Sequence, residues 1–390
     1  MIRLPDDHRL HRIGRTALLV AAFATAACLA GAIVDHDGQI YRSYLVAYLF
    51  WTGAALGSVA LLMINHVTGG AWGTAIRRFL EAMIRLFPVL AFLFLPIALG
   101  LPHLYEWARP DDVARDALLQ HKAPYLNVPF FLGRTAFYFA VWILVSRVLV
   151  RWSEAQDITT DPKPTERLEL VSRGGLLLMG LTMSFAAIDW MMSLEPHWAS
   201  TIYGVIFMGG SALTALALAI VLAALAREGT RLPDVISPDQ FHDLGKLLLA
   251  FTMLWAYFNV SQFIIIWSAN LPEEITWYLA RTTGGWRSVT VGLVVFHFVL
   301  PFMILLSRTV KRRPGALATV AGALLLARVV DVYWLIVPVF HAGGFALCWL
   351  DVAAFLAVGG LFVGLTIRQL TGRSLVPLHD PSLPIEAEHA

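Results

Sequence analysis

Cysteine and charge are both scarce in this chain of 390 residues. It has two cysteines, Cys28 and Cys348, and only 14% of its residues are charged. Both cysteines lie among apolar residues, which argues against a disulfide framework, an iron–sulfur cluster and a structural zinc site. We therefore expect no cofactor or metal on this chain, and any redox metal to be held by other chains.

Recognised cofactor and nucleotide motifs are missing as well. The sequence has no Cys-x-x-Cys-His for covalent haem attachment and no Walker or Rossmann glycine pattern. A b-type haem needs two imidazoles at one depth on facing helices. Only His297 lies deep in an apolar run, whereas His66, His103 and His341 lie at the ends of such runs. The sequence thus argues against a haem within this chain.

Hydrophobic residues, in contrast, make up 58% of the chain, far more than one soluble core could bury. Runs long enough to cross a bilayer of ~30 Å recur along the sequence. We predict an all-α, polytopic membrane protein that contacts the lipid bilayer and does not bind nucleic acid. Its ten predicted spans are centred on 16–34, 43–64, 83–102, 129–150, 174–193, 201–226, 246–269, 287–307, 315–338 and 345–367.

The distribution of basic residues predicts the orientation. Most of the 29 lysines and arginines fall in the N-terminal segment and in every second loop. The positive-inside rule therefore places both termini in the cytoplasm. Residues 1–370 form the predicted membrane domain, and residues 371–390, which contain three prolines, are expected to be an extended cytoplasmic tail. Residues 25–28 weakly resemble a lipoprotein cleavage box, so a processed first span is the competing interpretation.

Several ionisable residues lie where hydrocarbon is expected. They are His297, near the centre of the eighth span, Arg328 and Asp331 in the ninth, and Asp189 and Asp351 in the outer halves of two others. Such residues usually mark proton or substrate routes, and histidine titrates near neutrality. Our hypothesis is a proton route, with Asn259 and Gln262 holding water and with an entrance on the cytoplasmic side formed by His66, Asp243 and Lys246.

Purely structural interpretations compete with this hypothesis. Arg328 and Asp331 are three residues apart on one helical face, so a buried ion pair of Arg328 with Asp331 or Asp189 could simply fix helix register. A core histidine bonded to a hydroxyl or carbonyl group is the corresponding alternative for His297.

Four stretches of this chain carry a family resemblance that includes loops as well as apolar segments. They are 61–73 (LLMINHVTGGAWG), 189–204 (DWMMSLEPHWASTIYG), 255–274 (WAYFNVSQFIIIWSANLPEE) and 328–334 (RVVDVYW). The chain resembles the F-type membrane subunit of alternative complex III, a bacterial quinol:electron-acceptor oxidoreductase. This family is related to polysulfide-reductase-type membrane subunits, and the resemblance runs from about 66 to 334.

The resemblance implies two four-helix bundles, spans 2–5 (about 43–193) and 6–9 (about 201–338), with one flanking helix at each end. It also implies a bacterial inner membrane location. The implied partners are a homologous ten-span C subunit, an iron–sulfur protein, multihaem cytochrome c subunits and, in some assemblies, a terminal oxidase. Haem c and iron–sulfur clusters would belong to these partners, and the electron donor would be the reduced, quinol form of a quinone such as menaquinone. The candidates for a proton route that carry over are Asp189, His297, Arg328 and Asp331, with Asn259 and Gln262.

The sequence therefore favours an accessory membrane subunit of a quinol-oxidising respiratory complex, structural and contributing a proton route. Two alternatives stay open. In the first, this chain binds and oxidises quinol itself, although no quinone-binding residues can be named. In the second, it is a secondary transporter, for which discontinuous helices and a repeat interface are typical.

Overall fold

Ten long apolar helices dominate the structure, a computed structural model that describes residues 2–35, 37–341 and 343–380. Within these residues the chain is helical, without strands. This confirms the predicted class, an all-α multi-pass membrane protein. The ten spans are α1 (Arg9–Val34), α2 (Gln39–Thr68), α3 (Ala71–Ile84) continued by α4 (Phe87–Phe92) and α5 (Leu95–Leu99), α9 (Val128–Gln156), α10 (Lys163–Trp190), α11 (Tyr203–Ala226), α13 (Pro238–Ala269), α15 (Trp286–Leu293) continued by η3 (Val294–Val299) and α16 (Leu300–Leu306), α18 (Pro314–Ile336) and α19 (Trp349–Leu370).

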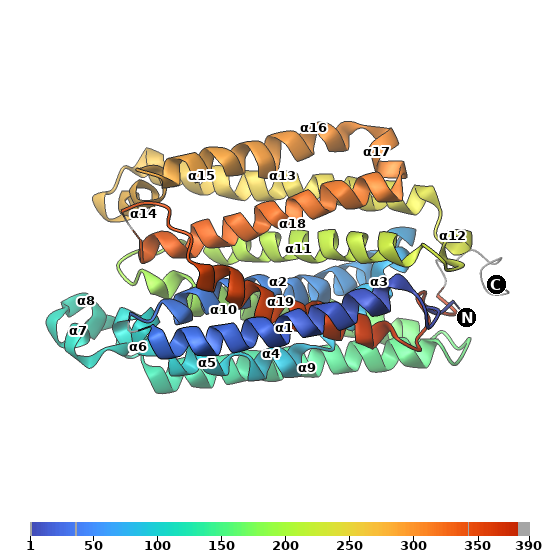
Figure 1. Cartoon of the computed structure of the whole chain (residues 1–390), viewed down its shortest axis with the longest axis horizontal. Coiled ribbons are helices and arrows are strands. Elements are labelled where there is room, and N and C mark those ends of the chain that lie inside the picture. Colours follow the sequence, from blue (N-terminus) through green and yellow to red (C-terminus); the bar gives the residue numbers. More distant parts are fainter. Residues whose placement is uncertain (1, 36, 342, 381–390) are drawn as a thin grey trace.

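Short helices connect these spans at the two ends of the molecule. The termini lie at one end, here called the terminal end, and the opposite end is the far end (Figure 1). The terminal end carries α12 (Leu232–Val235) and α17 (Arg308–Arg312). The remaining connections contain α6 (Leu101–Leu104), η1 (Glu106–Ala108), α7 (Pro110–Arg115), α8 (Ala117–Lys122), η2 (Met192–Leu194), α14 (Pro272–Thr282) and η4 (Val337–Val339).

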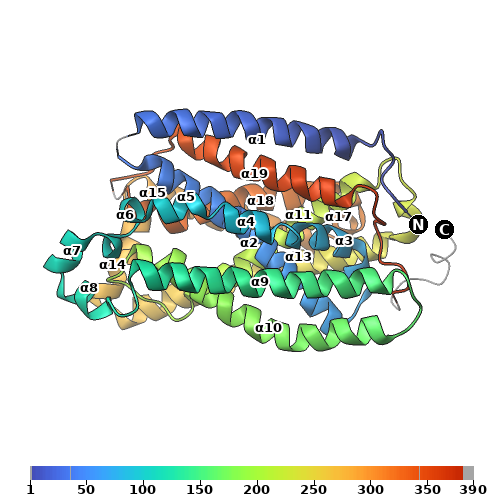
Figure 2. The ribbon, with the colours of Figure 1, turned by 90° about the horizontal axis from the view of Figure 1, so that it is seen from below.

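The spans pack as two four-helix bundles. In the first bundle α2 packs on α3 and α10, and α9 packs on α10 and α4. In the second bundle α11 packs on α13 and α18, and the α15–α16 span packs on α13 and α18. The bundles meet mainly through α2 and α11, while α1 and α19 run side by side along α2 (Figure 2). The predicted bundles with a flanking helix at each end are confirmed.

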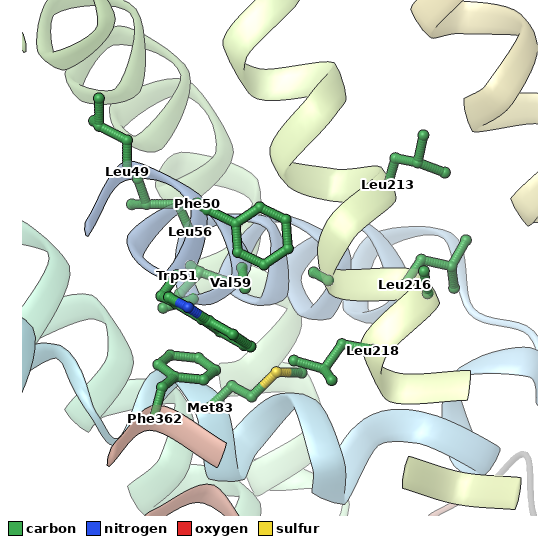
Figure 3. Close-up of a cluster of buried hydrophobic side chains, with 14 of the residues drawn as sticks. Leu49, Phe50, Trp51, Leu56, Val59, Met83, Leu213, Leu216, Leu218 and Phe362 are labelled. Atoms are coloured by element: carbon green, nitrogen blue, oxygen red, sulfur yellow. The ribbon is translucent and has the colours of Figure 1, made fainter. Parts of the chain in front are cut away.

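The meeting of α2 with α11 is tight because small residues line it. A Cβ atom on Gly57 would lie 2.0 Å from the backbone oxygen of Ser211, so only glycine lets the two backbones approach this closely. Around this contact lie buried side chains from four helices, among them Leu56, Met83 and Leu213 (Figure 3). The core of the protein therefore lies where the two bundles and α19 join.

The third span differs from its sequence-based boundaries. It begins at Ala71 rather than at 83, because Gly69 and Gly70 adopt positive φ angles of 71° and 104° and end α2 abruptly. The sequence before position 83 contains Arg77, Arg78 and Glu81, and charged residues there favour a loop. They are buried instead, because they pair with one another, and a hydropathy count cannot detect such pairing.

The C-terminal tail is folded against the chain itself. The backbone N–H of Leu375 donates to Ile2 O at 2.8 Å, and that of Leu378 donates to Asp157 Oδ1 at 2.8 Å. Residues 371–380 thus form turns docked on the terminal end rather than an extended tail. The rest of the predicted tail, 381–390, lies outside the described residues.

Candidate functional site

His297 lies in an unusual turn of the eighth span. The helix widens to a π-helix over η3, Val294–Val299, and Pro301 follows one turn after His297. Proline has no N–H to donate to the carbonyl four residues earlier, which is that of His297, and its ring crowds that carbonyl. A wider turn relieves this conflict, and π-bulges are frequent at functional sites. The sequence therefore explains why the helix changes form at this histidine.

Trp255 connects His297 to the charged residues of α18. Its ring lies 3.9 Å from the His297 ring, centroid to centroid, and its Nε1–H donates to Asp331 Oδ2 at 3.1 Å. Arg328 donates to the same carboxylate, and its Nε lies 3.4 Å from the Thr214 hydroxyl. These five residues, from four helices, are the second-bundle cluster.

A glycine on α11 makes room for the guanidinium of this cluster. A Cβ atom on Gly210 would lie 2.3 Å from Arg328 Nη2. At 1.5 Å per helical residue, Arg328 lies about 21 Å along α18 from Pro314, past the middle of the span. The cluster is thus in the interior of the second bundle, displaced from the midplane towards the far end.

Some polar atoms of the cluster have no hydrogen-bond partner within the described residues. They are both ring nitrogens of His297 and Oδ1 of Asp331, although these residues are only 0% and 1% exposed. An unsatisfied buried polar group typically costs about 1–3 kcal/mol, so native proteins rarely retain one without water or a function. A histidine and a carboxylate with free acceptor sites can bind water and exchange a proton with it.

Asp189 belongs to a different cluster, in the first bundle. Arg134 binds it with two hydrogen bonds, Nε to Oδ2 at 2.8 Å and Nη2 to Oδ1 at 2.9 Å. The Tyr138 hydroxyl adds a third bond, to Oδ2, at 2.7 Å, and the Arg134 guanidinium lies 3.8 Å from the Tyr125 ring centroid. Arg134, Tyr138 and Asp189 are the first-bundle cluster. The suggested pairing of Asp189 with Arg328 is wrong.

Sequence reasoning missed Arg134 because it lies near the start of the predicted span 129–150, where a basic residue is expected to face the membrane surface. The signal was an arginine inside a predicted span.

A second missed pair joins the α10–α11 hairpin to the second bundle. Arg281, fully buried, donates to Glu195 Oε2 at 2.9 Å and to Leu335 O at 2.9 Å.

A third missed group is the terminal-end network: Arg77, Arg78, Glu81, Ser153 and Asp157. Arg77 donates to Glu81 Oε1 at 3.0 Å, Arg78 donates to Glu81 Oε2 at 2.6 Å, and both arginines also reach the Ser153 hydroxyl. Arg78 pairs further with Asp157, but burial of that carboxyl raises its pKa above the ordinary value. The network joins α3 to α9.

The predicted entrance residues fall at two places. His66 Nδ1 lies 3.1 Å from the Ser172 hydroxyl, close to the terminal-end network. Asp243 and Lys246 pair with each other on α13 at 2.8 Å, and their side chains are 44% and 57% exposed. Their mutual neutralisation is typical of a surface ion pair.

The remaining candidates make local contacts. Asp351 caps the start of α19, accepting from the backbone N–H of Cys348 at 2.8 Å and from Ser43 Oγ at 2.6 Å. Asn259 donates to the Trp255 carbonyl one turn earlier, at 2.8 Å. Gln262 is buried and its Oε1 lies 3.2 Å from Ser200 Oγ. The ionisable residues expected in one group are therefore distributed over two bundles and a helix cap.

In the part of the chain that the structure describes, no three His, Cys, Asp or Glu side chains are grouped so as to hold a metal ion. No protein-family model matches the sequence, and a search of curated proteins gives no significant match.

Proposed function

We propose that this chain is an accessory membrane subunit of a quinol-oxidising respiratory complex of the alternative complex III type. Its partners include a homologous ten-span subunit and the separate subunits that carry haem c and iron–sulfur clusters. Both termini of this chain face the cytoplasm of a bacterium. The resemblance in four ordered stretches supports this assignment. The basic residues at the terminal end, including Arg9, Arg12 and Arg15, support the orientation.

Within that complex the second-bundle cluster takes up and passes on protons. The observation that carries this role is the buried pair of unsatisfied groups, His297 and Asp331, joined by Trp255. A buried carboxylate whose only role is structural tends to have its oxygens bonded, as those of Asp189 are. Here an imidazole and a carboxylate oxygen are left for water or a proton.

The experiment compares His297→Ala, Asp331→Asn and Asp189→Asn in the assembled complex, by rates of quinol oxidation and proton release. We expect the first two to lower proton release in complexes that still assemble, and the third to impair assembly. Normal proton release in both second-bundle variants would leave only a structural role. Purification without haem-c and iron–sulfur partners, as a lone chain that binds a solute, would instead indicate a transporter. Photolabelling of this chain by a quinone analogue would indicate that it binds quinol itself.

A further inference from the structure

A groove opens between α1 and α19, away from every cluster described above. It has a volume of about 680 Å³, within the range of ~300–1,000 Å³ usual for ligand pockets. Its walls are mostly apolar, formed by residues such as Val20 on α1 and Phe355 and Gly359 on α19, with Trp51 of α2 beneath them. Two arginines, Arg9 and Arg12, lie at one end of it.

The dimensions of the groove match one leaflet of a bilayer. From Arg9 to Val20 the helix advances about 17 Å at 1.5 Å per residue, close to half of the ~30 Å hydrocarbon thickness. The arginines lie at the terminal end, where the headgroups of that leaflet would be, and the apolar walls extend inward from them. A ligand that fills this groove must be anionic at one end and apolar over the length of an acyl chain.

The two arginines are available to such a headgroup to different degrees. They are three residues apart and so share one face of α1. Arg9 forms an ion pair with Glu228, whereas Arg12 is exposed and makes no ion pair or hydrogen bond with the described residues. A phospholipid would supply a phosphate for Arg12.

We infer that the α1–α19 groove is a specific site for an anionic phospholipid of the leaflet at the terminal end. Arg12, assisted by Arg9, binds the phosphate, and one acyl chain lies along Val20, Trp51 and Phe355. Basic pockets between membrane helices on the cytoplasmic side are known to recognise such headgroups. The inference does not depend on the respiratory role.

The first test uses the full chain reconstituted with an equal mixture of phosphatidylglycerol and phosphatidylethanolamine, then extracted for native mass spectrometry. We expect phosphatidylglycerol to be retained preferentially. Arg12→Gln should lower its retention about fivefold, the factor equivalent to ~1 kcal/mol for a basic residue near an anionic surface. Arg15→Gln, on the same helix but outside the groove, is the matched control and should change nothing. The inference would be overturned if the unaltered chain retained both lipids equally. It would also be overturned if the Arg12→Gln chain retained as much phosphatidylglycerol as the unaltered chain.

The second test fills the groove. Val20 lines it and is 37% exposed, while its neighbour Leu19 is 61% exposed and does not line it, so neither substitution disturbs the core. Val20→Trp should abolish retention of phosphatidylglycerol and Leu19→Trp should not; equal effects of the two would refute a site in the groove.

The third test identifies the natural occupant. A photo-crosslinking residue at position 20, activated in native membranes, should become linked to a phospholipid. A link to a polypeptide would show that a partner helix occupies the groove instead, and would also overturn the inference.

Discussion

The first-bundle and second-bundle clusters both bury an arginine beside an aspartate, but they satisfy these charges differently. Both oxygens of Asp189 are bonded, by Arg134 and Tyr138. In the second bundle only one oxygen of Asp331 is bonded, and His297 beside it makes no hydrogen bond through its ring within the described residues. A satisfied pair fixes how helices pack, whereas an unsatisfied group keeps the capacity to bind water and protons.

The largest expected loss of stability comes from breaking the ion pair between Arg134 and Asp189. Asp189→Asn leaves the Arg134 charge buried without its carboxylate, which should destabilise the fold by about 3–5 kcal/mol. Thermal unfolding of the variant and of the unaltered chain in detergent measures this loss of stability. Replacing both residues by leucine should recover most of the loss. Glu169→Gln, in an exposed pair with Arg173 on the same helix, is the control and should cost less than about 1 kcal/mol. If Asp189→Asn cost no more stability than this control, the first-bundle cluster would not be the structural pair that we infer.

The next effect tests the space around Arg328. Gly210→Ala places a Cβ where the guanidinium lies, so we expect a loss of about 1–3 kcal/mol from overpacking. Gly322→Ala on α18 is the matched control, because no atom lies within 4 Å of the position its Cβ would take and alanine favours helix by up to ~1 kcal/mol. Unfolding curves of both variants measure the difference. Equal stabilities would show that Arg328 is free to move.

A smaller effect, of opposite sign, is expected at His297. His297→Phe removes two unpartnered ring nitrogens and keeps a ring against Trp255, so stability should stay unchanged or rise by up to ~1 kcal/mol. Proton release should nevertheless fall. His103→Phe keeps the stack with Tyr41 at the far end and should alter neither property. A marked loss of stability in His297→Phe would mean that this histidine is as structural as Asp189.

The smallest effect is local and depends on pH. Asp116 caps α8, and the backbone N–H groups of Leu119 and Leu118, with His197, lower the pKa of its carboxyl. Because the folded pKa is below the unfolded one, the stabilisation is present above the unfolded pKa and is lost as pH falls through the folded value. Asp116→Ala should speed hydrogen exchange in 117–122 at neutral pH but not in strong acid. Asp111→Ala is the control, and an effect independent of pH would show that charge is not involved.

The sequence predicted what depends on local pattern. Apolar runs gave the ten spans, and a spacing of three residues placed Arg328 beside Asp331, as the structure has them. It could not predict partners that the packing of distant segments brings together. Asp189 and Arg134 are 55 residues apart, and Trp255 reaches Asp331 across 76 residues. Glu81 was not predicted to be buried, because Arg77 and Arg78, one helical turn before it, favour a loop at the start of the third span.

The π-helical turn at His297 also constrains how this chain can vary in length. Such a turn holds one residue more than the α-helical path on either side of it, and each residue turns an α-helix by about 100°. A deletion within Val294–Val299 would leave the span long enough to cross the membrane. Because the wide turn accommodates the extra residue, this deletion would close the turn to α-helical geometry and keep the helix faces on either side of it in register. A deletion elsewhere between Trp286 and Leu306 would instead rotate one side of the span relative to the other by about 100°, so the span tolerates the loss of one residue only at this turn.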